Sequence, residues 1–387
     1  MEYRVCTKGV WDTSVPGITF DDNGVSNYAH FLQSLFDKYP RGEQGLEDWN
    51  IILSDIKRKG EKKKYDCIIG VSGGTDSCYM LHMAKEWGLR PLAINVDNGF
   101  NSKISVENIR KVTKKLNIDF KTYIIDYDLV KKTLTSYMKA SLPWIDVPTD
   151  IAIKSVMYQF AKRYRVNHML NGQDFRSEGK QPFVWTASDT TQMRYLAKHF
   201  CNSNIRDYPC YNPFQMMWLS TMYDIKRVHP FNYVNYDKSS AREFLINEYG
   251  WEYYGEHHHE NSFTKFAIAY WLYEKFGIDK RIITYSSQVL SGSISRDTAL
   301  AILEKKPYDK DTIDSEIHYI LKKLSISQSD FDKMMRSPNM FVFDYPSDIR
   351  IFVRHPKTSM WISKHIFHHE PLFLRQVIDD SLDIYSH

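Results

Sequence analysis

The chain has 387 residues, which is enough for two domains and for a sizeable core without disulfide or metal staples. Lysine and arginine number 51 against 47 aspartate and glutamate, and the net charge of +4 is too small to indicate a nucleic-acid-binding protein. The five cysteines indicate no disulfide framework, and neither a signal-like N-terminus nor a bilayer-spanning apolar run is seen, so we expect a cytoplasmic protein without a membrane span.

Residues 1–60 predict a small N-terminal segment. Asn23-Gly24 is typical of a hairpin turn, and after Asn27 apolar residues recur at helical spacing. The basic run over residues 57–64 is interpreted as a solvated linker, because no aromatic residue is interleaved as in a nucleic-acid-binding surface.

The most informative stretch begins at a short apolar run, 67–71, that predicts a buried strand. It leads into Ser72-Gly73-Gly74-Thr75-Asp76-Ser77, and a helical pattern then continues to Trp87. Paired glycines let a backbone turn sharply and approach a ligand, and a helix start offers unpaired N–H groups that attract an anion. The loop has neither the lysine of a Walker A loop nor the spacing of a dinucleotide fingerprint. A turn that binds nothing is the alternative, but the strand–loop–helix setting favours nucleotide binding.

Strand and helix patterns alternate over residues 61–230. Further strands are expected at 92–96, 120–125 and 168–170, and helices at positions such as 104–116 and 151–164. This alternation predicts an α/β fold with a parallel, doubly wound sheet and helices on both faces. Ligands of such sheets bind at the carboxyl ends of the strands, so the loops 72–77, 97–100 and 171–178 should line one crevice.

Residues 231–387 predict a mainly helical third region. Its aromatic stripes, such as the one around Phe266 and Trp271, are typical of a core. The consecutive histidines 257–259 do not share one helix face and are interpreted as an exposed loop. Ser295 and Asp297 predict an N-cap and a first-turn acid.

The pattern SGGxDS after a strand resembles the PP-loop of the ATP pyrophosphatase superfamily. The resemblance implies that Ser72, Gly73, Gly74, Thr75, Asp76 and Ser77 bind ATP and that attack falls on its α-phosphate. Three further candidates belong to the same crevice: Asp97, Gly172 and Glu178.

The acidic candidates each have two interpretations. Asp76 either complements the dipole of its helix or holds Mg²⁺ against the phosphates. Asp97 is either a turn former or, as the superfamily resemblance implies, a residue near the adenosine. Glu178 is either a surface carboxylate or, because its segment GQDFRSEG resembles the third conserved segment of PP-loop enzymes, a catalytic or metal-binding group.

Several stretches together resemble a narrower family, the N-acetyl sugar amidotransferases of lipopolysaccharide O-antigen and related surface-glycan synthesis. They are CTKGVWDTSVPGITFDDNGVS near the start, SGGTDS, GQDFRSEG, and HHENSFT, KFGIDKR and SGSISRDTAL near the end. This resemblance implies an enzyme in which the acetamido oxygen of a nucleotide-linked sugar attacks ATP with Mg²⁺, pyrophosphate leaves, and ammonia displaces AMP to give an amidine. It makes Lys280, Arg281 and Arg296 candidates for binding the anionic sugar nucleotide, although as bare sequence they can equally be surface charges.

The chain shows no glutaminase motif of the terminal-cysteine or triad type. The resemblance therefore implies that ammonia comes from a separate glutaminase partner, related to the subunits of imidazole glycerol phosphate synthase.

One departure from the family concerns zinc. Family members carry two CxxC pairs near the N-terminus, whereas here only Cys6 is present and Gly9, Ser26 and Ala29 stand at the other positions. A structural zinc site needs four ligands, so we predict no zinc.

Two alternatives stay open. A tRNA-modifying PP-loop enzyme would need redox-active cysteines and a basic face, and a non-catalytic nucleotide-binding relative is compatible with the lost cysteines but not with the intact loop.

Overall fold

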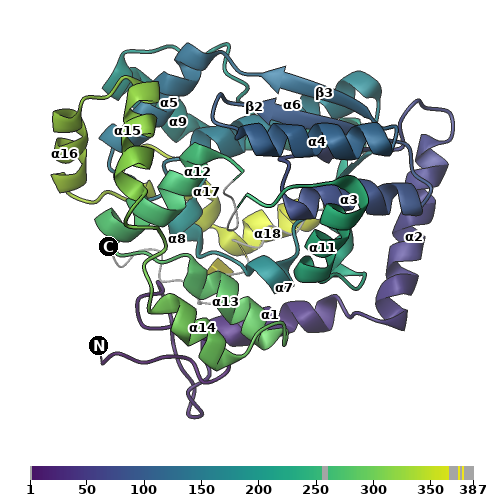
Figure 1. Ribbon diagram of the computed structural model, residues 1–387, viewed down its shortest axis with the longest axis horizontal. Coiled ribbons are helices and arrows are strands. Elements are labelled where there is room, and N and C mark those ends of the chain that lie inside the picture. Colours follow the sequence, from purple (N-terminus) through teal and green to yellow (C-terminus); the bar gives the residue numbers. More distant parts are fainter. Residues whose placement is uncertain (1, 255–259, 366–373, 375–376, 379–387) are drawn as a thin grey trace.

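Five short strands form one parallel sheet in the order β3-β2-β1-β4-β5. The structure is a computed structural model that describes residues 2–254, 260–365, 374, 377 and 378 (Figure 1). The strands are β1 (Cys67–Gly70), β2 (Pro91–Asp97), β3 (Asp119–Ile124), β4 (His168–Leu170) and β5 (Lys226–Val228). The first four confirm the predicted strands to within a residue at most ends, and the parallel α/β fold is confirmed with them.

Helices cover both faces of this sheet. Side chains of β1 alternate, so that Cys67 and Ile69 pack into a core with α2, α3, α4 and α11, whereas Ile68 packs into a second core with α6 and α10. These helices are α2 (Glu43–Gly60), α3 (Thr75–Glu86), α4 (Lys103–Lys115), α6 (Val147–Tyr164), α10 (Pro213–Met222) and α11 (Lys238–Tyr249). The sheet is thus doubly wound, as expected.

The prediction of a linker at residues 57–64 is wrong for the first half of this stretch. Helix α2 continues to Gly60, so Lys57, Arg58 and Lys59 form its last turn. Positive side chains are favourable there because the carboxyl end of a helix carries partial negative charge.

A third core joins the N-terminal segment to the helical C-terminal region, as Figure 1 shows where α1 lies beside α13. Its largest fully buried members include Trp11, Phe266 and Trp271. The remaining helices are α1 (Asn27–Lys38), α5 (Tyr127–Lys139), α7 (Phe175–Glu178), α8 (Phe183–Thr186), α9 (Thr190–Cys201), η1 (Pro230–Asn232), α12 (Ser262–Phe266), the π-helical η2 (Ala267–Lys275), α13 (Arg281–Leu290), α14 (Arg296–Leu303), α15 (Ile313–Leu324), α16 (Gln328–Arg336), η3 (Val342–Asp344), α17 (Ile349–Arg354) and α18 (Pro356–His365). The predicted cap at Ser295 is confirmed, because its side chain accepts a hydrogen bond from the Thr298 amide.

The N-terminal segment has local packing in place of the family's cysteines. The ring of Trp11 lies where a side chain on Gly9 would have to go, and Ser26 caps α1 through the Ala29 amide. Over the described residues, no three His, Cys, Asp or Glu side chains group as a metal site would require. The absence of zinc stays a prediction that rests on these replaced donors.

None of the helices in the described ranges combines the length and apolar character needed to cross a membrane.

Candidate functional site

The loop between β1 and α3 is folded on itself by its own serines. The Ser72 amide donates to the Ser77 hydroxyl at 3.3 Å, and the Gly74 amide donates to the Ser72 hydroxyl at 3.3 Å. Helix α3 starts directly afterwards, and within the described residues no side chain caps its first N–H groups. A compact loop followed by an uncapped helix start presents backbone donors to an anion.

Two glycines allow other loops to approach this one closely. Gly73 has φ +87°, and a Cβ on it would collide with the carbonyl oxygen of Ser105 in α4. A Cβ on Gly172 would lie 2.6 Å from the carbonyl oxygen of Asp76. The predicted loops 72–77 and 171–178 are therefore in contact at the carboxyl ends of neighbouring strands.

The carboxylate of Asp76 is held by two residues that the sequence analysis missed. The Tyr236 hydroxyl donates to one oxygen, and the Lys238 ammonium lies 2.7 Å from the other. Both residues follow β5, so recognising this fifth strand would have placed them at the crevice. Burial alone would lower the pKa of Lys238, but the charges of Asp76, Glu178 and Glu260 outweigh it and raise the pKa. Lys238 therefore stays an ammonium ion beside the loop.

These groups suit a magnesium-bound polyphosphate. Mg²⁺ commonly takes one or two carboxylates together with phosphate oxygens and water, and Asp76 supplies a carboxylate at the start of α3. Loop amides and Lys238 supply the positive side of the site.

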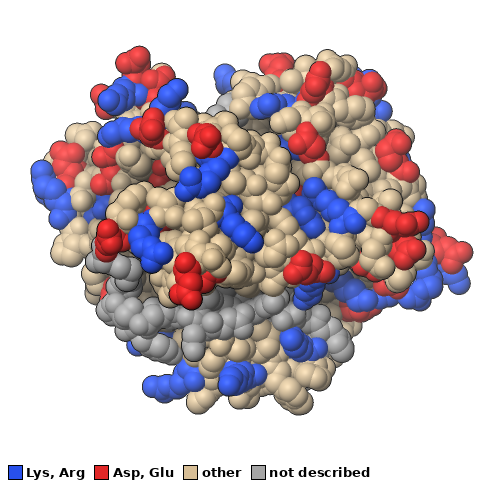
Figure 2. Space-filling model, turned by 90° about the horizontal axis from the view of Figure 1, so that it is seen from below, with Lys and Arg blue, Asp and Glu red and all other residues tan. Residues whose placement is uncertain are grey.

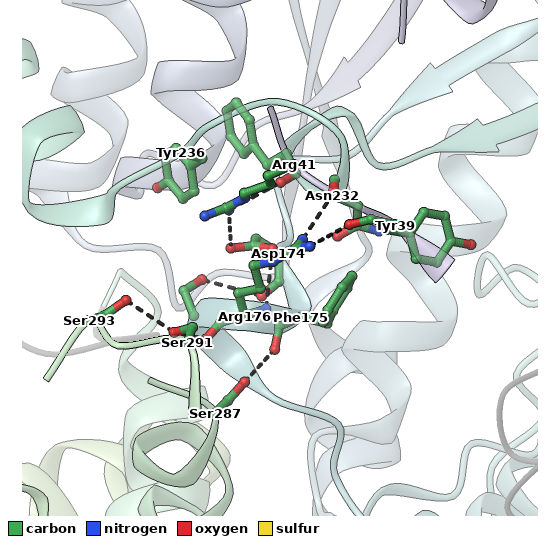
Figure 3. A network of polar contacts seen from close by, with 12 residues as sticks. Tyr39, Arg41, Asp174, Phe175, Arg176, Asn232, Tyr236, Ser287, Ser291 and Ser293 are labelled. Carbon is green, nitrogen blue, oxygen red and sulfur yellow. Dashed lines mark hydrogen bonds and ion pairs between the residues drawn. The ribbon is translucent and has the colours of Figure 1, made fainter. Parts of the chain in front are cut away.

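The third loop is held in place from the N-terminal segment (Figure 3). Asp174 caps α7 and pairs with Arg41 at 3.2 Å, and Arg176 donates to the backbone carbonyls of Tyr39 and Asn232. Burial raises the pKa of Asp174, although Arg41 opposes this shift.

Helix α13 fixes the same loop from the C-terminal region. Four side chains at helical spacing donate to carbonyl oxygens of α7: Ser287 to Phe175 at 2.6 Å, Gln288 to Ser177 at 3.0 Å, Thr284 to Glu178 at 3.3 Å and Ser291 to Arg176 at 3.4 Å. Figure 3 shows Ser287 and Ser291 below the loop. The backbone around Glu178 is therefore set by the C-terminal region.

The charge of Glu178 acts on several lysines, together with the charges of other carboxylates. These lysines are Lys180, Lys238 and Lys280. Burial lowers the pKa of Lys180, and it lowers the pKa of Lys280 to about 8. The predicted catalytic or metal-binding role of Glu178 stays a prediction.

The remaining predicted residues have local partners. Asp97 accepts a hydrogen bond from the Gly99 amide at 2.8 Å, as a turn former does. Arg281 is bound by Asp279 and by two backbone carbonyls, and Arg296 donates to the carbonyls of Gly9 and Cys6. Their predicted contacts with adenosine or sugar nucleotide stay predictions.

The segment before the histidines touches the nucleotide loop directly. The Trp251 indole donates to the Gly73 carbonyl at 3.0 Å, and the Tyr254 hydroxyl lies beside Gly74. His257, His258 and His259 fall outside the described residues. Farther on, Asn261 donates to Asn98 at the end of β2, which joins α12 to the sheet.

Two family models match separate parts of the chain. Residues 66–156 match the queuosine biosynthesis protein QueC, and residues 260–357 match the C-terminal domain of WbpG-like LPS biosynthesis proteins.

A curated relative, an uncharacterized protein of Methanocaldococcus jannaschii, is 38% identical over 92 residues, which are 23% of this chain and 32% of that protein. The match therefore spans about a third of that relative's length.

Three solved structures show low similarity. The first is a predicted subunit of tRNA methyltransferase from M. jannaschii, at 15% identity and a TM-score of 0.28 over 46% of this chain and 75% of that one. The second is an NMN synthetase from Francisella tularensis, at 16% identity and a TM-score of 0.29 over 59% and 92%. The third is an NH3-dependent NAD synthetase from Campylobacter jejuni, at 12% identity and a TM-score of 0.30 over 66% and 96%.

Proposed function

This chain belongs with the WbpG-like proteins of the PP-loop ATP pyrophosphatase superfamily, and we propose that it is an ATP-dependent amidotransferase acting on a nucleotide-linked N-acetyl sugar. The acetamido oxygen of the sugar would be replaced by nitrogen from ammonia, giving an acetamidino sugar for a surface glycan. The observation that carries the proposal is that the WbpG-like region contacts the third loop of the crevice, where Thr284 of α13 donates to the carbonyl of Glu178 and the charge of Glu178 acts on Lys280.

ATP would lie with its phosphates against the loop 72–77 and Lys238, and Asp76 would hold the Mg²⁺. The metal ion, when bound, neutralises phosphate charge during attack on the α-phosphate. The task of the protein is then alignment: the sugar oxygen must be held in line with that phosphorus, and bulk water must be kept away.

The proposed reaction needs no nucleophilic side chain. Cys78 follows the loop but is fully buried, and burial raises the pKa of its thiol to about 12. A thiol with that pKa stays protonated near neutral pH and is a poor nucleophile. We therefore assign Cys78 to packing.

We assign the negative charge of the sugar nucleotide to Lys180 rather than to Arg281 and Arg296. The two arginines are engaged with protein carbonyls and Asp279, whereas Lys180 follows the third loop and feels the charges of Glu178 and Asp174.

Ammonia would be supplied by a separate glutaminase, because no glutaminase motif is present in the sequence. The purified chain should use ammonium salts but not glutamine. Full activity with glutamine and the purified chain alone would contradict this partner.

A tRNA-modifying role is the second candidate, since the QueC match covers residues 66–156, which include the PP-loop. On the face seen in Figure 2, however, Lys and Arg are interspersed with Asp and Glu, whereas phosphate backbones favour a continuous positive tract. Binding to tRNA that weakens steeply with salt would favour this alternative.

The direct test combines ATP, Mg²⁺, ammonium and UDP- or CMP-linked N-acetyl sugars. We expect acceptor-dependent pyrophosphate release and a product with the mass change for exchange of oxygen by NH. Nucleotide binding without turnover on any acceptor would instead indicate a non-catalytic relative.

The Asp76→Asn variant ties that activity to the loop. Losing the carboxylate that holds Mg²⁺ should lower kcat/KM for pyrophosphate release by about 100-fold or more. The control is Asp128→Asn, which removes an exposed carboxylate that forms a surface ion pair with Lys131. If both variants keep the parent rate, Asp76 has no role in the reaction.

A further inference from the structure

Lys280 lies in a different environment from Arg281 and Arg296, the two arginines that were predicted with it to bind the sugar nucleotide. Its Nζ lies 4.1 Å from the centre of the Trp144 ring. The Thr284 amide donates to the Lys280 carbonyl one turn along α13, and the Thr284 hydroxyl donates to the Glu178 carbonyl, so Lys280 stands at the docked end of this helix.

Charged groups from each neighbouring element act on this lysine. They are Asp146 and Asp150 at the start of α6 and Glu178 at the end of α7. The Trp144 indole donates to Asp150 at 2.7 Å, which fixes the ring under the ammonium group. Burial nevertheless outweighs the three carboxylates and lowers the pKa of Lys280 to about 8. A fraction of Lys280 is therefore neutral at physiological pH.

Glu178 links this lysine to the nucleotide end of the crevice. The same carboxylate acts on Lys238, which pairs with Asp76 at the start of α3. The charge of Glu178 thus acts both on Lys238 at the start of α11 and on Lys280 at the start of α13.

We propose that Lys280 is the general base that converts ammonium into the attacking ammonia, rather than an anion-binding residue. The inference rests on the proposed function and names a residue for the second step of the reaction, in which ammonia displaces AMP. Burial keeps part of Lys280 neutral, while the Trp144 ring and the carboxylates stabilise the ammonium form that Lys280 reaches after taking a proton, so the side chain can receive a proton from ammonium.

The step balances as follows in atoms and electrons. An N–H bond of ammonium breaks, and the proton forms a bond to the lone pair of neutral Lys280. The freed nitrogen lone pair forms a bond to the imidate carbon, the bond from that carbon to the AMP oxygen breaks, and AMP leaves with the electron pair. No oxidant or reductant is involved.

The decisive variant is Lys280→Arg, because arginine keeps the positive charge but does not lose its proton in proteins. We expect Lys280→Arg and Lys280→Met both to lower amidine formation from ammonium by about 100-fold or more. The pyrophosphate burst without ammonium and the KM for the sugar should stay near the parent values, which also shows that the variants fold. Parent-like amidine formation by Lys280→Arg, or a raised KM with an unchanged kcat, would overturn the proposal in favour of anion binding.

Hydroxylamine gives an independent readout. It is largely neutral near pH 7, so it needs no base to expose its lone pair, and it should restore turnover in both variants. In the parent enzyme, turnover with ammonium should level off as pH passes about 8, where Lys280 loses its proton, whereas in Lys280→Arg the slow residual turnover should keep rising with the fraction of free ammonia. Variants that hydroxylamine does not rescue would contradict the proposal.

The matched control is Lys275→Arg. Lys275 also lies over a tryptophan, with Nζ 5.7 Å from the Trp271 ring, but it donates to the carbonyls of Met335 and Ser337 away from the crevice. This control should keep the parent activity. Absence of pyrophosphate release from the parent enzyme with every acceptor would contradict the proposed function itself, whereas a loss confined to the ammonium step concerns Lys280.

Discussion

Gly73 shows how one residue sets the shape of the nucleotide loop. Its φ of +87° is strained for any side chain, and a Cβ would collide with the backbone of Ser105. We expect Gly73→Ala to lower the free energy of unfolding by about 1–3 kcal/mol and to abolish ATP binding, because the loop must move away from α4. Urea unfolding and calorimetric titration with ATP measure the two effects.

Gly292→Ala is the control for this substitution. Gly292 has φ +79°, but nothing lies within 4 Å of the position of its Cβ. Gly292→Ala should therefore lower the free energy of unfolding through its backbone conformation alone, and it should leave ATP binding unchanged. Equal losses of ATP binding in the two variants would mean that the contact with Ser105 does not shape the site.

At the scale of elements, β4 carries a buried histidine that should make stability depend on pH. The side chain of His168 is 1% exposed, and burial, aided by Lys59 and Lys226, lowers its pKa from 6.5 to about 4 against the attraction of Asp55. Between these two pKa values the unfolded chain binds a proton that the folded chain does not. The free energy of unfolding should therefore fall as pH falls from 6.5 to 4, by about 3 kcal/mol from this residue.

The measurement is urea unfolding of the parent and of His168→Gln across this range. Other acids also titrate there, so the informative quantity is the difference between the two proteins, which should shrink as pH falls. His199→Gln removes an exposed histidine and should follow the parent curve. A difference that is independent of pH would contradict the lowered pKa.

The elements that sequence patterns predicted are those with a local signal. Strands β1 to β4 have apolar runs or clear boundaries, whereas β5 has three residues of which Lys226 and Arg227 are charged. Helix α2 was not predicted, and its last turn was interpreted as a linker because its charged residues show no apolar spacing; the buried residues of the helix, such as Trp49 and Ile56, lie farther upstream.

The candidate site was predictable only in part for a similar reason. The residues of the loop 72–77 are contiguous in sequence, so they form a motif that can be recognised without the structure. Tyr236 and Lys238 lie far from this loop in sequence and reach Asp76 because they follow β5, and Arg41 of the N-terminal segment binds Asp174 in the neighbouring third loop. Likewise, Arg281 and Lys280 are neighbours in sequence, and only the fold shows that one is bound by Asp279 while the other lies on Trp144.

For the whole molecule, the contacts between regions predict cooperative unfolding. Trp251 binds the Gly73 carbonyl, Asn261 binds Asn98, and α13 binds α7, so the C-terminal region and the sheet support each other. Trp271 is fully buried in the C-terminal core, whereas Cys67 is fully buried in a different core beneath α3. If the two regions unfold together, a substitution that destabilises the core around Trp271 should also expose Cys67 at a lower urea concentration.

Trp271→Ala should lower the free energy of unfolding by about 3–5 kcal/mol, because a large cavity forms and the indole bond to the Leu142 carbonyl is lost. Labelling of thiols at increasing urea, read for the Cys67 peptide by mass spectrometry, should shift to lower urea together with the far-ultraviolet circular dichroism. Ser315→Ala, which removes an exposed hydroxyl bound to a local carbonyl, is the control and should shift neither. Cys67 protection that keeps its parent midpoint while the dichroism shifts would show that the sheet stands without the C-terminal region, and that the crevice between them is not a single cooperative unit.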